Sequence, residues 1–150
     1  NTFSRFILYS YLNKRLKTNN AGADDAFGWS VAISEDGTMI YAGAPGEDSS
    51  ITVATCSDPA NNSSLSNSGA IYSFGINAGS FTQGMLFKPL TNGTLGASGT
   101  DYYGLNVSCN TTGKIIAYGT GHEDGSATTV NGTVNSSATD AGCVIVSTAP

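Results

Sequence analysis

Apolar and polar residues alternate along a short stretch near the start of the chain. Trp29, Val31 and Ile33 alternate with small or polar neighbours, and this period of two predicts a half-buried β-strand with these three side chains in the core. The turn at 35–37 contains a glycine, which suits a tight hairpin connection. Residues 38–44 are apolar on both faces and therefore predict a strand in the interior of the same sheet.

The same pattern occurs again further along the chain. Three matches without gaps define the repeat: 27–48 with 103–124, 69–74 with 142–147, and 81–90 with 3–12. The first match has an offset of 76 residues and the second an offset of 73, so the loops between them differ by three residues. Self-similarity of this kind indicates repeated structural units.

The repeat predicts an all-β fold with two four-stranded antiparallel, propeller-blade-like sheets. The first unit, at about 21–90, supplies four strands in order, whereas the second, at about 97–150, supplies three. The strand missing from the second sheet has its copy near the start of the chain. We therefore expect a strand and linker in residues 1–20 and a two-sheet body in residues 21–150.

Two short motifs in the first unit resemble a known repeat family. The pair FG at 27–28 and the triplet GAP at 43–45 are similar to FG-GAP repeats, which form the β-propellers of integrin α chains and of many secreted bacterial proteins. The second unit is more divergent, with YG at 103–104 and GTG at 119–121. The resemblance implies four-stranded blades that serve adhesion or assembly rather than catalysis. Its calcium loop is not carried over, because the hairpin turns here are short.

Two sheets are too few for a closed propeller, which needs about four to eight blades. A sheet without its last strand exposes unpaired backbone groups. We therefore expect the N-terminal strand to complete the second sheet by β-strand addition. Its assembly residues are Phe3, Phe6, Ile7, Leu8, Tyr9 and Tyr11. The strand could fold back onto its own chain, but this needs a tight return, so a neighbouring copy of the chain is the favoured acceptor.

Charge is sparse and unevenly distributed. Ser, Thr, Asn and Gly make up 68 of the 150 residues, and these types are poor helix formers. The net charge of -5 has the wrong sign for a nucleic-acid partner, and no apolar run approaches the roughly 20 residues of a membrane helix. Residues 1–20 hold four basic residues and no acidic one, whereas residues 21–150 hold two basic and eleven acidic residues. A basic arm could thus dock onto an acidic body.

Sequons and cysteines favour a secreted or cell-surface protein with possible glycans. Seven candidate N-glycosylation sites occur, at Asn61, Asn62, Asn92, Asn106, Asn110, Asn131 and Asn135. Asn106 and Asn110 fall on one face of a predicted strand, where a glycan would prevent another sheet from packing. Cys56 and Cys143 are expected near the same rim and form the preferred disulfide, which leaves Cys109 as a buried thiol or, as the alternative, a link between subunits.

Candidate catalytic chemistry is sparse. His122 is the only histidine and corresponds to Gly46 in the first repeat, so a repeated structural position explains it more simply than catalysis. The Glu-Asp pairs at 47–48 and 123–124 could bind a hard cation such as Ca²⁺, although solvated charge at the rim is the simpler interpretation. We expect no enzyme activity, no cofactor and no metal site.

These observations favour a non-enzymatic structural subunit of an extracellular filament or surface appendage. It would polymerise by inserting its N-terminal strand into the next subunit. The alternative is an adhesin, or a carbohydrate- or protein-binding fragment of a larger FG-GAP β-propeller.

Overall fold

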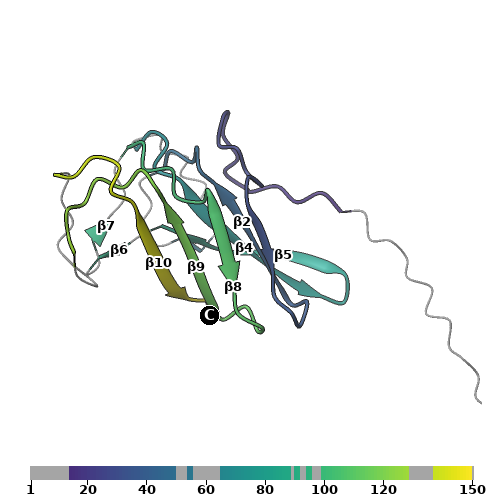
Figure 1. Cartoon of the computed structure of the whole chain (residues 1–150). Coiled ribbons are helices and arrows are strands. Elements are labelled where there is room, and N and C mark those ends of the chain that lie inside the picture. The colour runs from purple at the N-terminus through teal and green to yellow at the C-terminus, as the bar shows by residue number, and fades with distance from the viewer. Residues whose placement is uncertain are drawn as a thin grey trace, which may run out of the picture.

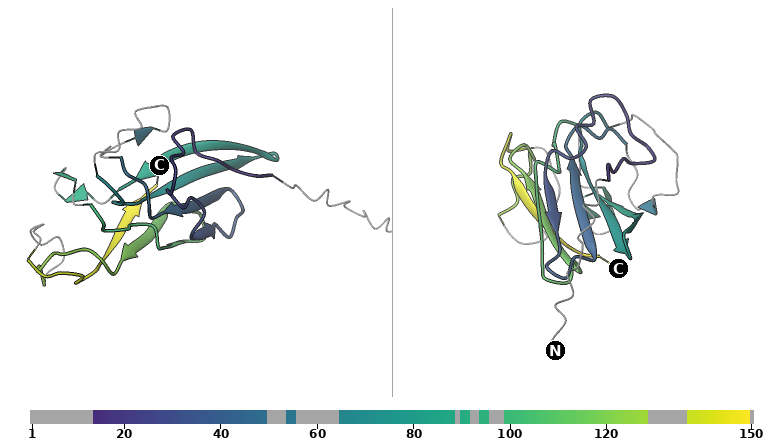
Figure 2. Two further views of the ribbon diagram at one scale, coloured as in Figure 1. Left: turned by 90° about the horizontal axis from the view of Figure 1, so that it is seen from above. Right: turned by 90° about the vertical axis from the view of Figure 1, so that its right-hand side faces the viewer.

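The computed structural model describes residues 14–49, 54–55, 65–88, 90–91, 94–95, 99–128 and 137–149. These residues form strands and turns without a helix, and most of the strands belong to two sheets packed as layers (Figures 1 and 2). The strands are β1 (Val31–Ile33), β2 (Met39–Ala44), β3 (Ala54–Thr55), β4 (Ala70–Asn77), β5 (Ser80–Phe87), β6 (Leu90–Thr91), β7 (Thr94–Leu95), β8 (Asn106–Cys109), β9 (Ile115–Thr120) and β10 (Cys143–Thr148). The predicted all-β class, with two blade-like antiparallel sheets, is confirmed.

The first sheet has the strand order β1-β2-β4-β5-β3. Its four longer strands pair antiparallel in chain order, as the repeat predicts for a complete unit. The two-residue strand β3 was not predicted, because it has no counterpart in the four-stranded unit that the repeat defines. It pairs with the outer edge of β5 through Ala54 opposite Leu86 and Thr55 opposite Met85.

The second sheet has the order β10-β9-β8 and is also antiparallel. Its strands correspond to β4, β2 and β1 of the first sheet. Within the described part of the chain, β10 has one neighbour and no counterpart of β5 lies beyond it. The strand predicted to fill this place, at 3–12, lies outside the described residues. β6 and β7 form a separate two-stranded ladder.

The two sheets repeat each other in their backbone conformation. Six pairs of equivalent residues have matching positive φ angles: Asp24 64° and Thr100 72°, Ala26 54° and Tyr102 53°, Gly28 91° and Gly104 104°, Gly37 69° and Gly113 69°, Asn67 55° and Asp140 53°, and Gly69 77° and Gly142 75°. Left-handed backbone is uncommon outside glycine, so shared angles at these positions are a stringent test of equivalence. The alignment read from the sequence is therefore a structural repeat, and it extends back to residue 24.

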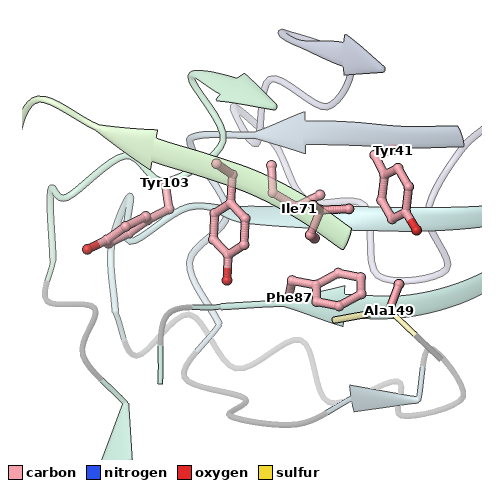
Figure 3. Packing of buried hydrophobic residues seen from close by; sticks show 7 residues of the cluster. Tyr41, Ile71, Phe87, Tyr103 and Ala149 are labelled. Carbon is pink, nitrogen blue, oxygen red and sulfur yellow. The ribbon is translucent and has the colours of Figure 1, made fainter. Parts of the chain in front are cut away.

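The main core lies between the two sheets. The face of the first sheet that bears Tyr41, here called the Tyr41 face, packs against the face of the second sheet that bears Tyr118, called the Tyr118 face (Figure 3). The buried members of this cluster are Tyr41, Ile71, Phe87, Tyr103, Ile116, Tyr118 and Ala149. Since both sheets contribute, neither could exclude water from its apolar face alone.

The opposite face of the first sheet, the Tyr72 face, has a second and smaller core. Its buried members are Ala44, Ala70, Tyr72, Phe74 and Leu86. Leu16 and Phe27, which precede β1, pack against this face, and the Phe27 ring lies edge-on to Tyr72 and Phe74 at centroid distances of 5.7 and 5.9 Å. Part of the face is therefore covered by the chain that leads into the sheet.

The prediction that Trp29, Val31 and Ile33 lie in the core is wrong. Their side chains are 65%, 64% and 61% exposed. The period of two is correct but its direction is reversed: Val31 and Ile33 lie on the Tyr72 face beyond the segment that covers it. Ala32 instead packs against the main core. An alternating strand cannot reveal which face is covered, because that depends on the neighbouring layer.

Close approach of the two backbones explains why small residues face the second sheet. A Cβ added at Gly43 would lie 2.0 Å from the Gly104 carbonyl oxygen. The Ser30 hydroxyl donates a hydrogen bond of 2.8 Å to the same oxygen. Larger side chains at these two positions would force the sheets apart.

Candidate assembly surfaces

The outer edge of β10 presents backbone groups that β9 does not use. The Ala149 N–H donates to the Lys114 carbonyl at 2.8 Å, in line with the β9–β10 register. Hydrogen-bonded and non-hydrogen-bonded positions alternate along an antiparallel pair, so the N–H and C=O groups of Val144 and Val146 point away from β9. In the first sheet, Ile71 occupies the place of Val144, and there β5 provides the partner strand.

Apolar side chains accompany this open edge. The face of the second sheet turned away from the first, here called the Val144 face, exposes Val144 (73%), Val146 (68%) and Ile115 (47%). With Trp29, Val31 and Ile33 near or on the Tyr72 face, these complete the set of exposed large hydrophobic side chains in the described residues. Contiguous exposed apolar patches mark interaction surfaces more often than isolated side chains do.

A buried polar cluster closes one rim of the first sheet. Glu47 is 1% exposed, which contradicts the expectation of solvated charge at this position. Its carboxylate accepts a short hydrogen bond from the Tyr72 hydroxyl, one of 3.3 Å from the Asn20 amide and one of 3.0 Å from the Ser49 N–H. Burial and the adjacent Glu47 carboxylate raise the pKa of Tyr72, so its hydroxyl remains a donor.

Lys88 lies at the end of β5 beside this cluster and is 4% exposed. Its ammonium donates to the Ser68 hydroxyl at 2.6 Å and to the Gly69 carbonyl at 2.8 Å. Burial lowers the pKa of Lys88 to about 8, against the opposing effect of Glu47, Asp48 and Asp25. The lysine thus fixes the last residues of the outer strand to the start of β4.

The Glu-Asp pairs at 47–48 and 123–124 perform the same structural task in both repeats. The Asp48 carboxylate accepts the Asn67 N–H at 2.7 Å, and the Asp124 carboxylate accepts the Asp140 N–H at 2.9 Å. The carbonyls of the preceding glutamates accept the N–H of Gly69 and of Gly142 in the same way. These bonds close the base of each long loop. The part of the chain that the structure describes contains no cluster of three potential metal ligands.

His122 follows β9 at the rim of the second sheet. Its Nδ1 lies 3.1 Å from an Asp140 carboxylate oxygen, and its ring packs edge-on against Tyr102 at 5.4 Å. It also borders a hollow of about 320 Å³ between the rims of the two sheets. Asp24, Trp29 and Asn67 contribute to the same hollow, which the sequence did not reveal because its walls come from distant segments.

The sequons and cysteines are only partly within the described residues. Asn61, Asn62, Asn92, Asn131, Asn135 and Cys56 lie outside them, as do all six assembly residues of the N-terminal strand. Asn106 is exposed on the Val144 face, as predicted. The Asn110 side chain accepts the Ile115 N–H at 3.0 Å and thereby supports the β8–β9 turn.

Cys109 and Cys143 are partly buried and form no disulfide with each other. They lie on the two outer strands of the second sheet, with β9 between them, as predicted. The Tyr103 hydroxyl lies 3.4 Å from the Cys143 sulfur. Burial is the main cause that raises the pKa of both thiols. A Cys56–Cys143 bridge stays a prediction.

The described residues form two antiparallel sheets that resemble propeller blades. The family model described as FG-GAP repeat matches residues 13–74, which comprise most of the first repeat. The resemblance inferred from the FG and GAP motifs is confirmed for the first repeat. Proteins with such repeats are typically extracellular or on the cell surface, and the repeats typically act as non-enzymatic binding modules. No curated protein matches the chain. The described residues include no helix that could span a membrane.

Proposed function

We propose that this chain is a non-enzymatic, secreted subunit of an extracellular filament or surface appendage. Each copy inserts residues 3–12 as the fourth strand of the second sheet of another copy. The outer edge of β10, along which no described strand pairs, is the observation that carries this proposal. Four backbone groups of Val144 and Val146 point to that edge, and main-chain pairing is the usual source of affinity in β-strand addition.

The first sheet provides a template for the inserted strand. There, Phe87 of β5 lies opposite Ile71 of β4. The repeat relates Phe87 to Tyr9 and Ile71 to Val144, so Tyr9 would lie opposite Val144. In the same register, the apolar residues Ile7 and Tyr9 would extend the Val144 face.

Charge supports the same docking direction. The inserted strand would end near the start of β10, where acidic residues of the loop base lie: Glu123, Asp124 and Asp140. Basic residues follow the strand directly in the sequence: Lys14, Arg15 and Lys17. Attraction between these basic residues of the donor and the acidic residues of the acceptor favours the correct orientation of the strand and speeds up association.

Deletion of residues 1–12 tests the proposal. The truncated protein should stay monomeric in sedimentation velocity at concentrations at which the full chain assembles. A synthetic peptide of residues 3–12 should bind the truncated protein, and a peptide of the same composition in scrambled order should not. Unchanged assembly of the truncated protein would show that this strand does not drive it.

An adhesin or binding fragment of a larger propeller is the second candidate function. The hollow at the rim favours it, because Trp29 and Tyr102 offer aromatic surface beside the polar side chains of Asp24 and Asn67. Pockets of this size and mixed lining suit small ligands. Binding of a glycan from an array by the monomer, lost in Trp29→Ala, would support this candidate. A monomeric full chain that binds such a ligand would favour it over the filament.

A further inference from the structure

We infer that the copy that donates its strand also stacks its Tyr72 face on the Val144 face of the acceptor. This inference rests on the proposed strand addition and adds a second contact surface between the same two copies. It follows from the repeat, because the exposed faces of one chain are copies of the two faces that meet inside it.

The exposed side chains correspond to residues that are packed in the interior contact. On the Val144 face, Val144 and Ile115 are the copies of Ile71 and Met39, which pack between the sheets. On the Tyr72 face, Val31 and Ile33 are the copies of two residues of β8, Val107 and Cys109. Those two residues also pack against the main core. A Val144 face laid on a Tyr72 face would therefore repeat a contact that this sequence already makes.

The Tyr72 face also has room for the backbone of a second copy to approach closely, at Gly28. Gly104 is buried in the interior contact, where an added Cβ would lie 2.6 Å from the Ala70 carbonyl oxygen and 3.2 Å from the Gly43 Cα. Its copy, Gly28, has no atom within 4 Å of an added Cβ and is exposed. Across a stacked contact, Asn106 would take the place of Ser30 and could donate its amide to the Gly28 carbonyl of the donor copy.

The path of the chain indicates that the copy donating residues 3–12 is also the copy whose Tyr72 face contacts the acceptor. Inside the chain, β5 belongs to the first sheet, and the segment after it leads to Tyr103, which packs in the contact with the next sheet. The equivalent segment follows residues 3–12 and leads to Phe27, which packs on the Tyr72 face. By this analogy, residues 3–12 would belong to the sheet of another copy that covers the donor's Tyr72 face. The second sheet of the same chain covers the Tyr41 face, so it is not the acceptor.

Stacking of two different faces is a heterologous contact, which produces closed rings or open helical stacks. Rings of about four to eight sheets correspond to about two to four copies. Both outcomes leave every internal sheet with both of its faces covered.

Two variants, one that can only accept a strand and one that can only donate it, limit assembly to a single contact between two copies. Deletion of residues 1–12 leaves an acceptor that cannot donate. Val146→Pro leaves a donor that cannot accept, because proline removes an N–H from the open edge and is tolerated at such a position. Each variant alone should be monomeric, and an equimolar mixture should form a one-to-one complex in sedimentation velocity or native mass spectrometry. Val146→Ala is the control that keeps the N–H group, and it should assemble.

The double substitution Val31→Asp with Ile33→Asp then tests face stacking. Placed in the donor, it should weaken the one-to-one complex by about tenfold or more, whereas placed in the acceptor it should have no effect. The control, Ser80→Asp with Thr82→Asp, adds the same charge to exposed positions of the same sheet and should be neutral in either copy. Equal or absent effects in donor and acceptor would overturn the stacking and leave strand addition standing. Absence of any complex in the mixture would overturn both.

Discussion

At the scale of single residues, the buried polar cluster of the first sheet shows where a sequence stops being informative. Glu47 and Asp48 form a conspicuous acidic pair, and their repetition at 123–124 correctly indicates a shared structural role. Burial of Glu47 depends on Tyr72 and Asn20, which come from other parts of the chain. The second repeat has isoleucine in place of Tyr72, so the repeat pattern alone did not indicate the hydrogen bond between Tyr72 and Glu47.

Lys88 gives this cluster a measurable pH dependence. Unfolded lysine holds its proton up to a pH near 10.5, whereas folded Lys88 releases it near pH 8. The unfolded state therefore binds more protons in this window, and stability should rise as the pH increases through it. Relative to Lys88→Met, the free energy of unfolding should increase by about 3 kcal/mol or less between pH 8 and 10.5, because a tenfold change in proton binding is worth about 1.4 kcal/mol.

Urea denaturation of both proteins across this pH range measures the effect. Tyr41 and Tyr118, whose pKa values burial raises to about 12, reduce the stability of both proteins at the alkaline end. The difference between the two proteins removes this common contribution. Parallel pH profiles would mean that Lys88 titrates as an ordinary surface lysine.

At the scale of the strands, the order and pairing could be predicted because hairpin turns and interior strands carry strong local signals. The glycine turns at 35–37 and 111–113 and the doubly apolar strands β2 and β9 lie where the pattern indicated. The direction in which β1 faces could not be predicted. Its larger side chains, Val31 and Ile33, suggested the covered face, but the second sheet covers the face with the small residues, where Gly43 and Gly104 come into close contact.

Gly28 and Gly104 form a matched pair for testing that contact. Both have a positive φ, so alanine at either position introduces backbone strain of about 1–3 kcal/mol. Gly104→Ala should cost additional stability, since its Cβ would lie 2.6 Å from the Ala70 oxygen, whereas Gly28→Ala meets open space within the monomer. Thermal unfolding of the monomeric truncation lacking residues 1–12 would compare the two. Equal destabilisation would argue against close packing of the sheets at Gly104.

At the scale of the whole molecule, the two sheets expose one face each, and the exposed faces correspond to the two that are buried between them. The sequence indicated that the second unit supplies three strands where the first supplies four, and the described residues show these three. It did not indicate the exposed Tyr72 face, since the strand that carries Val31 and Ile33 has the same alternation whether it is covered or not.

Asn106 reports on the state of the Val144 face. It is an exposed sequon on the same face as Val144, which the stacked copy would cover. Assembled material should therefore carry no glycan at Asn106. Mass spectrometry of peptides from purified assemblies measures this. Full occupancy of Asn106 in assemblies would be incompatible with the stacked contact.

The central claim is that residues 3–12 pair with β10 of another copy in the register of β5 on β4. Extending the register one residue beyond Phe87 and Ile71 places Ser10 opposite the native Cys143. This position is not hydrogen-bonded to the inserted strand, so the two side chains lie close together, within the range that a disulfide spans.

Oxidation of Ser10→Cys, followed by non-reducing electrophoresis, tests this claim most directly. We predict covalent dimers and longer species linked through Cys143, and their loss when Cys143→Ser is added. Tyr9→Cys, one residue out of register and on the other face, should give far less product. Formation of only a linked monomer would show that the strand folds back on its own chain. Absence of any link to Cys143 would contradict the proposed pairing.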